Sequence, residues 1–131
     1  MSKAIDPKYI YSDLSHDIIG AAYDAQNKAG VGCREKTYQQ LMAVEFVRRG
    51  YKYKEQVKAI INPGEINEIV RRFDFVVEDK IVVELKVGPH LGKEDYEQMK
   101  EYLNISGYKL GLLVLFSYKG VVSKRLPNIF Q

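Results

Sequence analysis

The chain has 131 residues, of which 46% are hydrophobic and 28% charged, and its formal net charge is +3. These fractions are typical of one globular domain and argue against a disordered chain, while the mildly basic balance permits a polyanionic partner without requiring one. The single cysteine, Cys33, excludes a disulfide within the chain and a metal cluster held by thiolates. No segment is apolar over the length of a membrane span, and residues 1–11 carry no secretion signal, so we expect a cytoplasmic protein.

The order of elements predicts a mixed sheet flanked by helices. After an irregular lead-in over residues 1–12, helical spacing of apolar residues predicts helices over residues 14–29, 35–49 and 93–106. Alternating or β-branched runs predict strands over residues 51–61, 66–77, 81–87, 109–116 and 121–126. The first three strands should form an antiparallel meander. The third helix is then a crossover, so the third and fourth strands are expected to run parallel.

Two charged residues, Glu84 and Lys86, interrupt the apolar strand over residues 81–87. Because side chains alternate along a strand, both lie on the same face, and the turn at residues 78–80 can bring Asp74 of the preceding strand beside Glu84. Two adjacent carboxylates repel each other, and a divalent cation is the simplest way to keep both ionised. The alternative is a buried ion cluster without function, although buried ionic groups seldom add net stability.

The helices contribute further polar candidates. Glu35 begins the second predicted helix and faces roughly the same way as Tyr38, one turn later. A first-turn carboxylate is also favoured by the helix dipole alone, so Glu35 has a structural explanation as well as a functional one. In the third predicted helix, Gln98 and Tyr102 are four residues apart and share a face.

Three short patterns occur in order along these elements. Asp74 followed by Glu84-Leu85-Lys86 resembles the Asp…Glu-x-Lys signature of the PD-(D/E)XK nuclease superfamily, although Phe73 stands where proline is often found. The stretch from Gly32 to Tyr38 resembles the Gly-x-x-Glu-x-x-Tyr pattern of its GxxExxY family. The stretch from Gln98 to Tyr102 resembles the Gln-x-x-x-Tyr motif of exonuclease-like branches. The resemblance covers about residues 14–126. It implies a restriction-endonuclease-like α-β-β-β-α-β core, of the α/β (α+β) class, in one domain over residues 1–131.

The resemblance implies a nuclease that hydrolyses phosphodiester bonds of DNA or RNA, with Mg²⁺ or Mn²⁺ as cofactor. Asp74 and Glu84 would hold the ion through oxygen atoms, and the backbone carbonyl of Leu85 would be a further ligand. Glu35 would add a carboxylate, either directly or through a metal-bound water.

The remaining motif residues would act on the substrate. Lys86 would stabilise or orient the attacking water and the pentavalent state, while Gln98 and Tyr102 would position the substrate backbone or support Lys86. A homodimer is attractive, because the chain is small for embracing a duplex alone. Four basic residues are candidates for phosphate contacts, although most are equally explained as solvated surface: Lys54, Lys58, Arg71 and Arg72.

Other classes of function remain open. One is a nuclease-fold module that binds nucleic acid without cleaving it, and another is a protein that uses the fold to hold a partner or a second copy of itself. The complete set of motif residues argues against the first. A cysteine hydrolase based on Cys33 is more distant, because His16 and His90 are the only possible bases and neither is recognisably paired with it.

Overall fold

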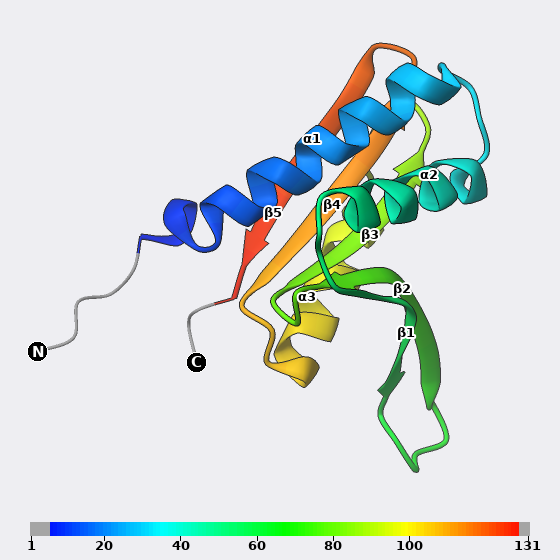
Figure 1. The fold of residues 1–131 in the computed structure, drawn as a ribbon. Helices are drawn as coiled ribbons and strands as arrows, with labels where there is room; N and C mark the ends of the chain where they lie inside the picture. The colour runs from blue at the N-terminus through cyan, green and yellow to red at the C-terminus, as the bar shows by residue number, and fades with distance from the viewer. Residues whose placement is uncertain (1–5, 129–131) are drawn as a thin grey trace, which may run out of the picture.

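Figure 1 shows the structure of the protein, a computed structural model that describes residues 6–128. Its helices are α1 (Ser12–Ala29), α2 (Glu35–Arg48) and α3 (Lys93–Ser106), and a short 3-10 helix, η1 (Pro7–Tyr9), precedes them. Its strands are β1 (Tyr53–Ile61), β2 (Ile69–Val77), β3 (Ile81–Val87), β4 (Leu110–Ser117) and β5 (Gly120–Pro127). Within residues 6–128, no helix is long and apolar enough to cross a membrane.

The five strands form one mixed sheet in the order β1-β2-β3-β4-β5. The β3–β4 pair is parallel and the other pairs are antiparallel, which confirms the predicted crossover through α3. Helices α1 and α2 pack on one face of the sheet and α3 packs on the other (Figure 1). The sheet is therefore the middle layer of three, as the sequence predicted.

Small residues set how closely the helices approach the sheet. On α1, the stripe Ile18, Ala21, Ala22 and Ala25 is fully buried. On the other face, Gly111 of β4 lies directly under α3. A Cβ atom at this position would lie 2.6 Å from the Sδ atom of Met99, closer than side-chain packing allows. The missing side chain at Gly111 is therefore what lets α3 dock on the centre of the sheet.

Three predicted boundaries differ from the structure by two or more residues, and several others by one. Residues 1–5 of the predicted lead-in lie outside the described residues, but η1 follows them and α1 already begins at Ser12. The strand predicted over residues 51–61 begins at Tyr53, after the chain has left α2. The strand predicted over residues 66–77 begins only at Ile69, because turn hydrogen bonds, including one from the Gly64 N–H to the Glu68 carboxylate at 2.8 Å, satisfy the preceding backbone.

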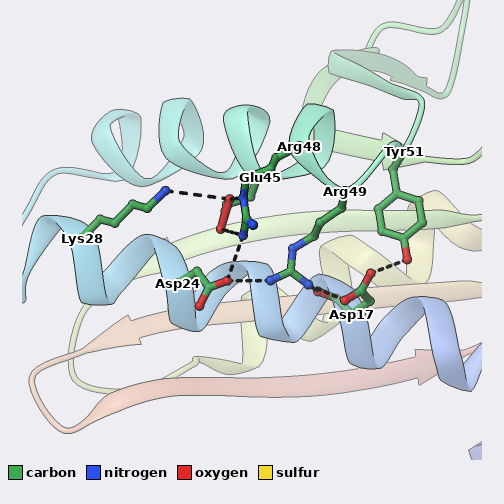
Figure 2. Close-up of polar contacts among 7 residues, drawn as sticks. All are labelled: Asp17, Asp24, Lys28, Glu45, Arg48, Arg49 and Tyr51. Atoms are coloured by element: carbon green, nitrogen blue, oxygen red, sulfur yellow. Dashed lines mark hydrogen bonds and ion pairs between the residues drawn. The ribbon is translucent and has the colours of Figure 1, made fainter.

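A network of charged side chains joins α1 to the end of α2 (Figure 2). Arg48 donates two hydrogen bonds to the carboxylate of Glu45, at 2.7 and 2.8 Å, and Arg49 donates to Asp24 of α1 at 2.6 Å. Glu45 is buried, and the Arg48 hydrogen bond is the main reason that its pKa falls to about 2. Asp17, Lys28 and Tyr51 complete the network. It fixes α2 against α1, and it thereby sets the position of Glu35 at the other end of α2.

Strands β2 and β3 pair over only a short stretch. β2 pairs with β1 from Tyr53↔Val77 to Ile61↔Ile69, but it pairs with β3 only through Phe75, Val76 and Val77. Beyond Phe75 the β1–β2 hairpin leaves the sheet and projects away from the rest of the molecule, while β3 continues beside β4 (Figure 1). Asp74, which directly precedes Phe75, is therefore the β2 residue at which the two strands separate.

Candidate active site

The separation of β2 from β3 is where Asp74 and Glu84 meet. The backbone N–H of Leu85 donates to the Asp74 Oδ2 atom at 2.7 Å, and the backbone N–H of Asp74 donates to the Glu84 Oε1 atom at 3.2 Å. A buried backbone amide needs an acceptor, and these two have lost the regular ladder partners that a continuous sheet would supply. The carboxylates take the place of those partners. The strand separation and the carboxylate pair thus depend on each other.

Neither carboxylate is well solvated. Asp74 is only 5% exposed, and Glu84 is half-buried. Burial is the main cause that raises the pKa of Glu84 well above the usual carboxyl range, and the neighbouring Asp74 is the next. Without a cation, the pair favours keeping a proton, because two neighbouring carboxyl groups that share a buried site do not both ionise easily. A cation bound here would therefore stabilise the ionised form of both carboxylates.

A cleft of about 720 Å³ opens beside the pair, between α2 and the first strands. Glu35 lines it from the first position of α2, and burial, followed by the charge of Asp74, raises the pKa of Glu35. Gln56 lines it from β1, where its backbone adopts φ of 50°. The Gln56 side chain donates to the Asp74 Oδ1 atom at 3.2 Å and to the side-chain oxygen of Gln39 on α2 at 3.1 Å. Gln56 therefore links α2 to the carboxylate pair, a role that the alternation of β1 did not reveal.

Lys86 follows Glu84 on the same face of β3, as predicted, and its partner comes from α3. The Lys86 Nζ atom lies 3.5 Å from the Oδ1 atom of Asp95, and the two side chains are 33% and 21% exposed. The other oxygen of Asp95 accepts the backbone N–H of Gly92 at 2.9 Å and so caps the first turn of α3. Asp95 was not selected from the sequence. An acidic residue three positions after a glycine that precedes a helix is a capping signal, but it does not reveal which lysine the carboxylate will meet.

The two α3 residues chosen from the sequence occupy different environments. Tyr102 is buried, and its ring stacks on Phe73 of β2 with centroids 4.3 Å apart. This stacking anchors the base of the β1–β2 hairpin to α3 and explains an aromatic residue at position 73. Gln98 lies one turn earlier and is partly exposed. Their predicted role, to position the substrate or to support Lys86, remains a prediction. The residue of α3 that pairs with Lys86 in the structure is Asp95.

The stretch from Gly32 to Tyr38 shapes the start of α2. The Tyr38 hydroxyl donates to the carbonyl oxygen of Gly30 at 2.6 Å and accepts the Cys33 N–H at 3.4 Å, while its ring stacks on Phe116 of β4. Gly32 adopts φ of 81°, a conformation that favours glycine. Tyr38 therefore holds the loop that precedes Glu35. The stretch from Gly32 to Tyr38 thus has a structural role as well as supplying the Glu35 carboxylate.

All four basic candidates lie on the β1–β2 hairpin, but they do not share one face. Arg72 lines the cleft and pairs across the strands with Lys58, which is also exposed. Arg71 pairs with Ala59, which packs in the cluster beneath α3, so it lies on the opposite face. Lys54 lines a separate cavity near the turn between β2 and β3. The structure thus brings Arg72 to the carboxylates and places Lys58 beside it.

The donors at the pair suit a hard divalent cation, because they are carboxylate and backbone oxygen atoms. Across residues 6–128, no group of three or more His, Cys, Asp or Glu side chains converges to hold a metal ion on its own. Asp74 and Glu84 would therefore be the side-chain ligands, with the Leu85 carbonyl and water completing the shell. Glu35 lines the same cleft, and its predicted role, directly at the ion or through a metal-bound water, stays a prediction.

Among the described residues, Cys33 lacks the adjacent base that a cysteine hydrolase needs. Its thiol donates to the carbonyl oxygen of Ala29 at 3.4 Å, at the end of α1, and both His16 and His90 are exposed on other elements. A nucleophilic thiol requires an adjacent base, so this surrounding argues against the cysteine alternative.

Fold and site together place the chain among the nuclease-like α+β domains. The family model described as the PD-(D/E)XK nuclease superfamily matches residues 12–126, and the chain therefore belongs to this superfamily. No curated protein matches the chain.

Two solved structures are similar in fold. The crystal structure of SSO0001 matches with a TM-score of 0.55 and 17% identity, over 95% of this chain and 62% of that one, so the chain spans less than two thirds of SSO0001. The crystal structure of an alkaline exonuclease, LHK-Exo from Laribacter hongkongensis, matches with a TM-score of 0.53 and 13% identity, over 98% of this chain and 72% of that one. At such identities the likeness concerns the fold, and it confirms the predicted mixed sheet flanked by helices.

Proposed function

We propose that the protein hydrolyses phosphodiester bonds of DNA or RNA with Mg²⁺ or Mn²⁺ bound at Asp74 and Glu84. Nucleases of this superfamily generally use divalent metals. The observation that carries the proposal is the carboxylate pair at the strand separation, because burial and mutual repulsion make it a site that a cation stabilises. The family membership supplies the reaction class.

The chain's own residues divide the work. When bound, the ion supplies Lewis-acid activation of the phosphate and of a water molecule. Asp74 is already fixed by the Leu85 N–H and by Gln56, so its carboxylate needs little reorganisation to accept a cation. Lys86, held beside Asp95, stabilises or orients the attacking water and offsets the negative charge on the phosphoryl oxygen atoms. Glu35 would act from across the cleft, either directly on the ion or through a water bound to it.

The substrate runs along the basic side of the cleft. Arg72 and Lys58 are best placed to contact phosphates, because they adjoin the carboxylates on the exposed face of the hairpin. Lys54 and Arg71 extend the basic surface on other faces. From α3, Gln98 positions the substrate backbone or supports Lys86. Tyr102 is buried against Phe73 and so acts indirectly, by holding the base of the β1–β2 hairpin. The finer expectations from the sequence remain part of the proposal: membership of the GxxExxY branch, a cytoplasmic location and a homodimer.

Metal binding and cleavage test the site together. We expect calorimetry with Mg²⁺ and Mn²⁺ to show binding to the parent and to the control Glu101→Ala, which removes an exposed carboxylate of α3. Asp74→Ala and Glu84→Ala should lose metal binding and cleavage of labelled DNA and RNA, while circular dichroism shows an intact fold. Lys86→Ala should keep metal affinity and lose turnover. Cleavage by purified Glu84→Ala at the parent's rate would refute the assignment. Salt-dependent binding without cleavage by the parent would make the protein a binding module instead.

A further inference from the structure

One face of the β1–β2 hairpin carries exposed side chains beyond the active-site cleft. Beyond Asp74, the face that looks away from α3 carries two successive cross-strand pairs, Lys58↔Arg72 and Ile60↔Val70. Ile60 is 44% exposed and Val70 is 52% exposed, and both cations are exposed as well. On the opposite face, Ala59 and Phe73 are buried in the cluster beneath α3, so the hairpin is held to the body from that side.

Both pairs are unfavourable in the isolated protein. Like charges directly opposite on neighbouring strands repel each other, so Lys58↔Arg72 destabilises the hairpin unless an anion lies between them. Ile60↔Val70 leaves two aliphatic side chains facing water on an element that projects from the body (Figure 1). A ligand that offers negative charge beside an apolar surface would remove both penalties at once.

The two pairs follow each other at the spacing of a nucleotide. Residues two apart on a strand are separated by about 7 Å, so the aliphatic pair lies about one nucleotide length beyond the basic pair. Arg72 also lines the cleft with Asp74 and Glu84, which makes the hairpin face a continuation of the proposed active site. A phosphate held at Lys58 and Arg72 would therefore bring a neighbouring base to Ile60 and Val70.

Aliphatic side chains contact the flat face of a base only where that face is uncovered. In a duplex the faces are stacked, and apolar side chains reach them only by unstacking a step, whereas in single strands they are free for contact. We propose that the outer face of the β1–β2 hairpin, formed by Lys58, Ile60, Val70 and Arg72, binds unpaired nucleotides. The protein then acts on single-stranded segments or frayed ends of nucleic acid. This inference rests on the proposed function, whose substrate class it narrows.

A second copy of the chain fits this face less well. A two-fold symmetric contact places the same patch of both subunits together, so the basic pair of one subunit would face the basic pair of the other or lie close to it. The exposed charges of the patch itself, Lys58 and Arg72, are all positive. Charge complementarity therefore favours a polyanion over self-association.

Binding measurements without divalent metal test the inference, because they do not require cleavage. Fluorescence anisotropy would compare a labelled single strand of about 20 nucleotides with the blunt duplex of the same sequence, in EDTA and over a range of salt concentrations. Ile60→Thr/Val70→Thr keeps β-branched residues in the strands, and Lys58→Gln/Arg72→Gln removes the cations. Val122→Thr and Lys124→Gln make the same chemical changes at exposed positions on β5, at the other edge of the sheet.

The two variants should weaken nucleic-acid binding in different ways. The aliphatic variant should bind the single strand about 5- to 10-fold more weakly with an unchanged salt slope, and it should bind the duplex as the parent does. The cation variant should weaken binding to both probes and reduce the salt slope for the single strand by about 1.4, or about 0.7 for each lost contact. Both β5 controls should match the parent.

Other outcomes overturn the inference. Equal weakening on single strand and duplex, or no weakening by the aliphatic variant, would show that bases do not contact this face. A change of sedimentation coefficient in the aliphatic variant would identify a contact between subunits. A different result would refute the proposed function alone. In that case the parent would show the expected binding pattern but would cleave neither probe with Mg²⁺ or Mn²⁺. Conversely, cleavage of both probes with no effect of the aliphatic variant would preserve the nuclease and remove this inference.

Discussion

Asp95 should position Lys86, and Asp95→Asn is the sharpest way to test this. The substitution removes the negative charge that lies 3.5 Å from the Lys86 ammonium, yet an amide oxygen can still accept the Gly92 N–H that caps α3. Asp95→Ala removes both interactions. The pair of variants therefore separates the contribution of the ion pair from that of the cap.

The expected magnitudes follow from the geometry. At 3.5 Å and an effective dielectric constant of about 20, two unit charges attract by about 5 kcal/mol. Both side chains retain some exposure, and desolvation and side-chain ordering reduce the net contribution to about 1 kcal/mol. The cap adds about 1 kcal/mol. Asp95→Asn should therefore lower the free energy of unfolding by about 1 kcal/mol, and Asp95→Ala by about 2 kcal/mol.

Catalysis should respond more strongly than stability. Once the ammonium of Lys86 is no longer held, a small misplacement lowers kcat by about 10- to 100-fold and changes KM little. Asp95→Glu should recover part of the loss, because it restores the charge. Glu97→Gln is the matched control: it removes an exposed carboxylate that pairs with Lys93 one turn away on the same helix, and it should change neither quantity appreciably.

Two assays complete the test. Urea unfolding would be measured for Asp95→Asn, Lys86→Met and the double variant, and single-turnover cleavage for the Asp95 series. A coupling free energy near zero in the double-mutant cycle would show that the ion pair contributes nothing to stability. An unchanged kcat in Asp95→Asn would show that Lys86 does not depend on Asp95, and the reasoning would then be wrong.

Three further predictions concern the scaffold. Tyr38→Phe should lower the free energy of unfolding by about 1 kcal/mol, since it removes the hydroxyl that holds the loop before α2; an unchanged urea midpoint would contradict this. Gly111→Ala should destabilise by about 1–3 kcal/mol through overpacking against Met99, and a melting temperature equal to the parent's would show that α3 shifts freely. Glu45→Gln should be less stable than the parent near neutral pH. The hydrogen bond from Arg48 lowers the folded-state pKa of Glu45 to about 2, so its stabilisation is present above the usual carboxyl pKa and is lost as the pH falls toward 2. A gap between parent and variant that persists at about pH 2 would refute the assignment.

Local patterns predicted much of this fold because the site is built mainly from neighbours in sequence. Asp74 and Glu84 belong to one hairpin with a short turn, so alternation alone placed them side by side. The crossover through α3 also followed from element order, since parallel strands require a long connection.

What the sequence did not predict depends on contacts between distant elements. Asp95 meets Lys86 only because α3 docks over β3, and the left-handed conformation of Gln56 arises opposite Asp74, where β2 departs from β3. The strand predicted from Ile66 is longer than the observed one, because the sequence pattern does not record where side-chain and turn hydrogen bonds replace the pairing between strands.

The brief pairing of β2 with β3 has a mechanical consequence. Phe75, Val76 and Val77 join β2 to β3 over a short stretch, so we expect the outer part of the hairpin to move about that stretch as a lever. Displacement grows with distance from a pivot and vanishes at the pivot itself. Asp74 lies next to the residues that pair with β3, while the turn between β1 and β2 lies at the far end of the hairpin (Figure 1). We therefore expect the hairpin to adjust to nucleic-acid strands of different shape while the carboxylate pair keeps its geometry.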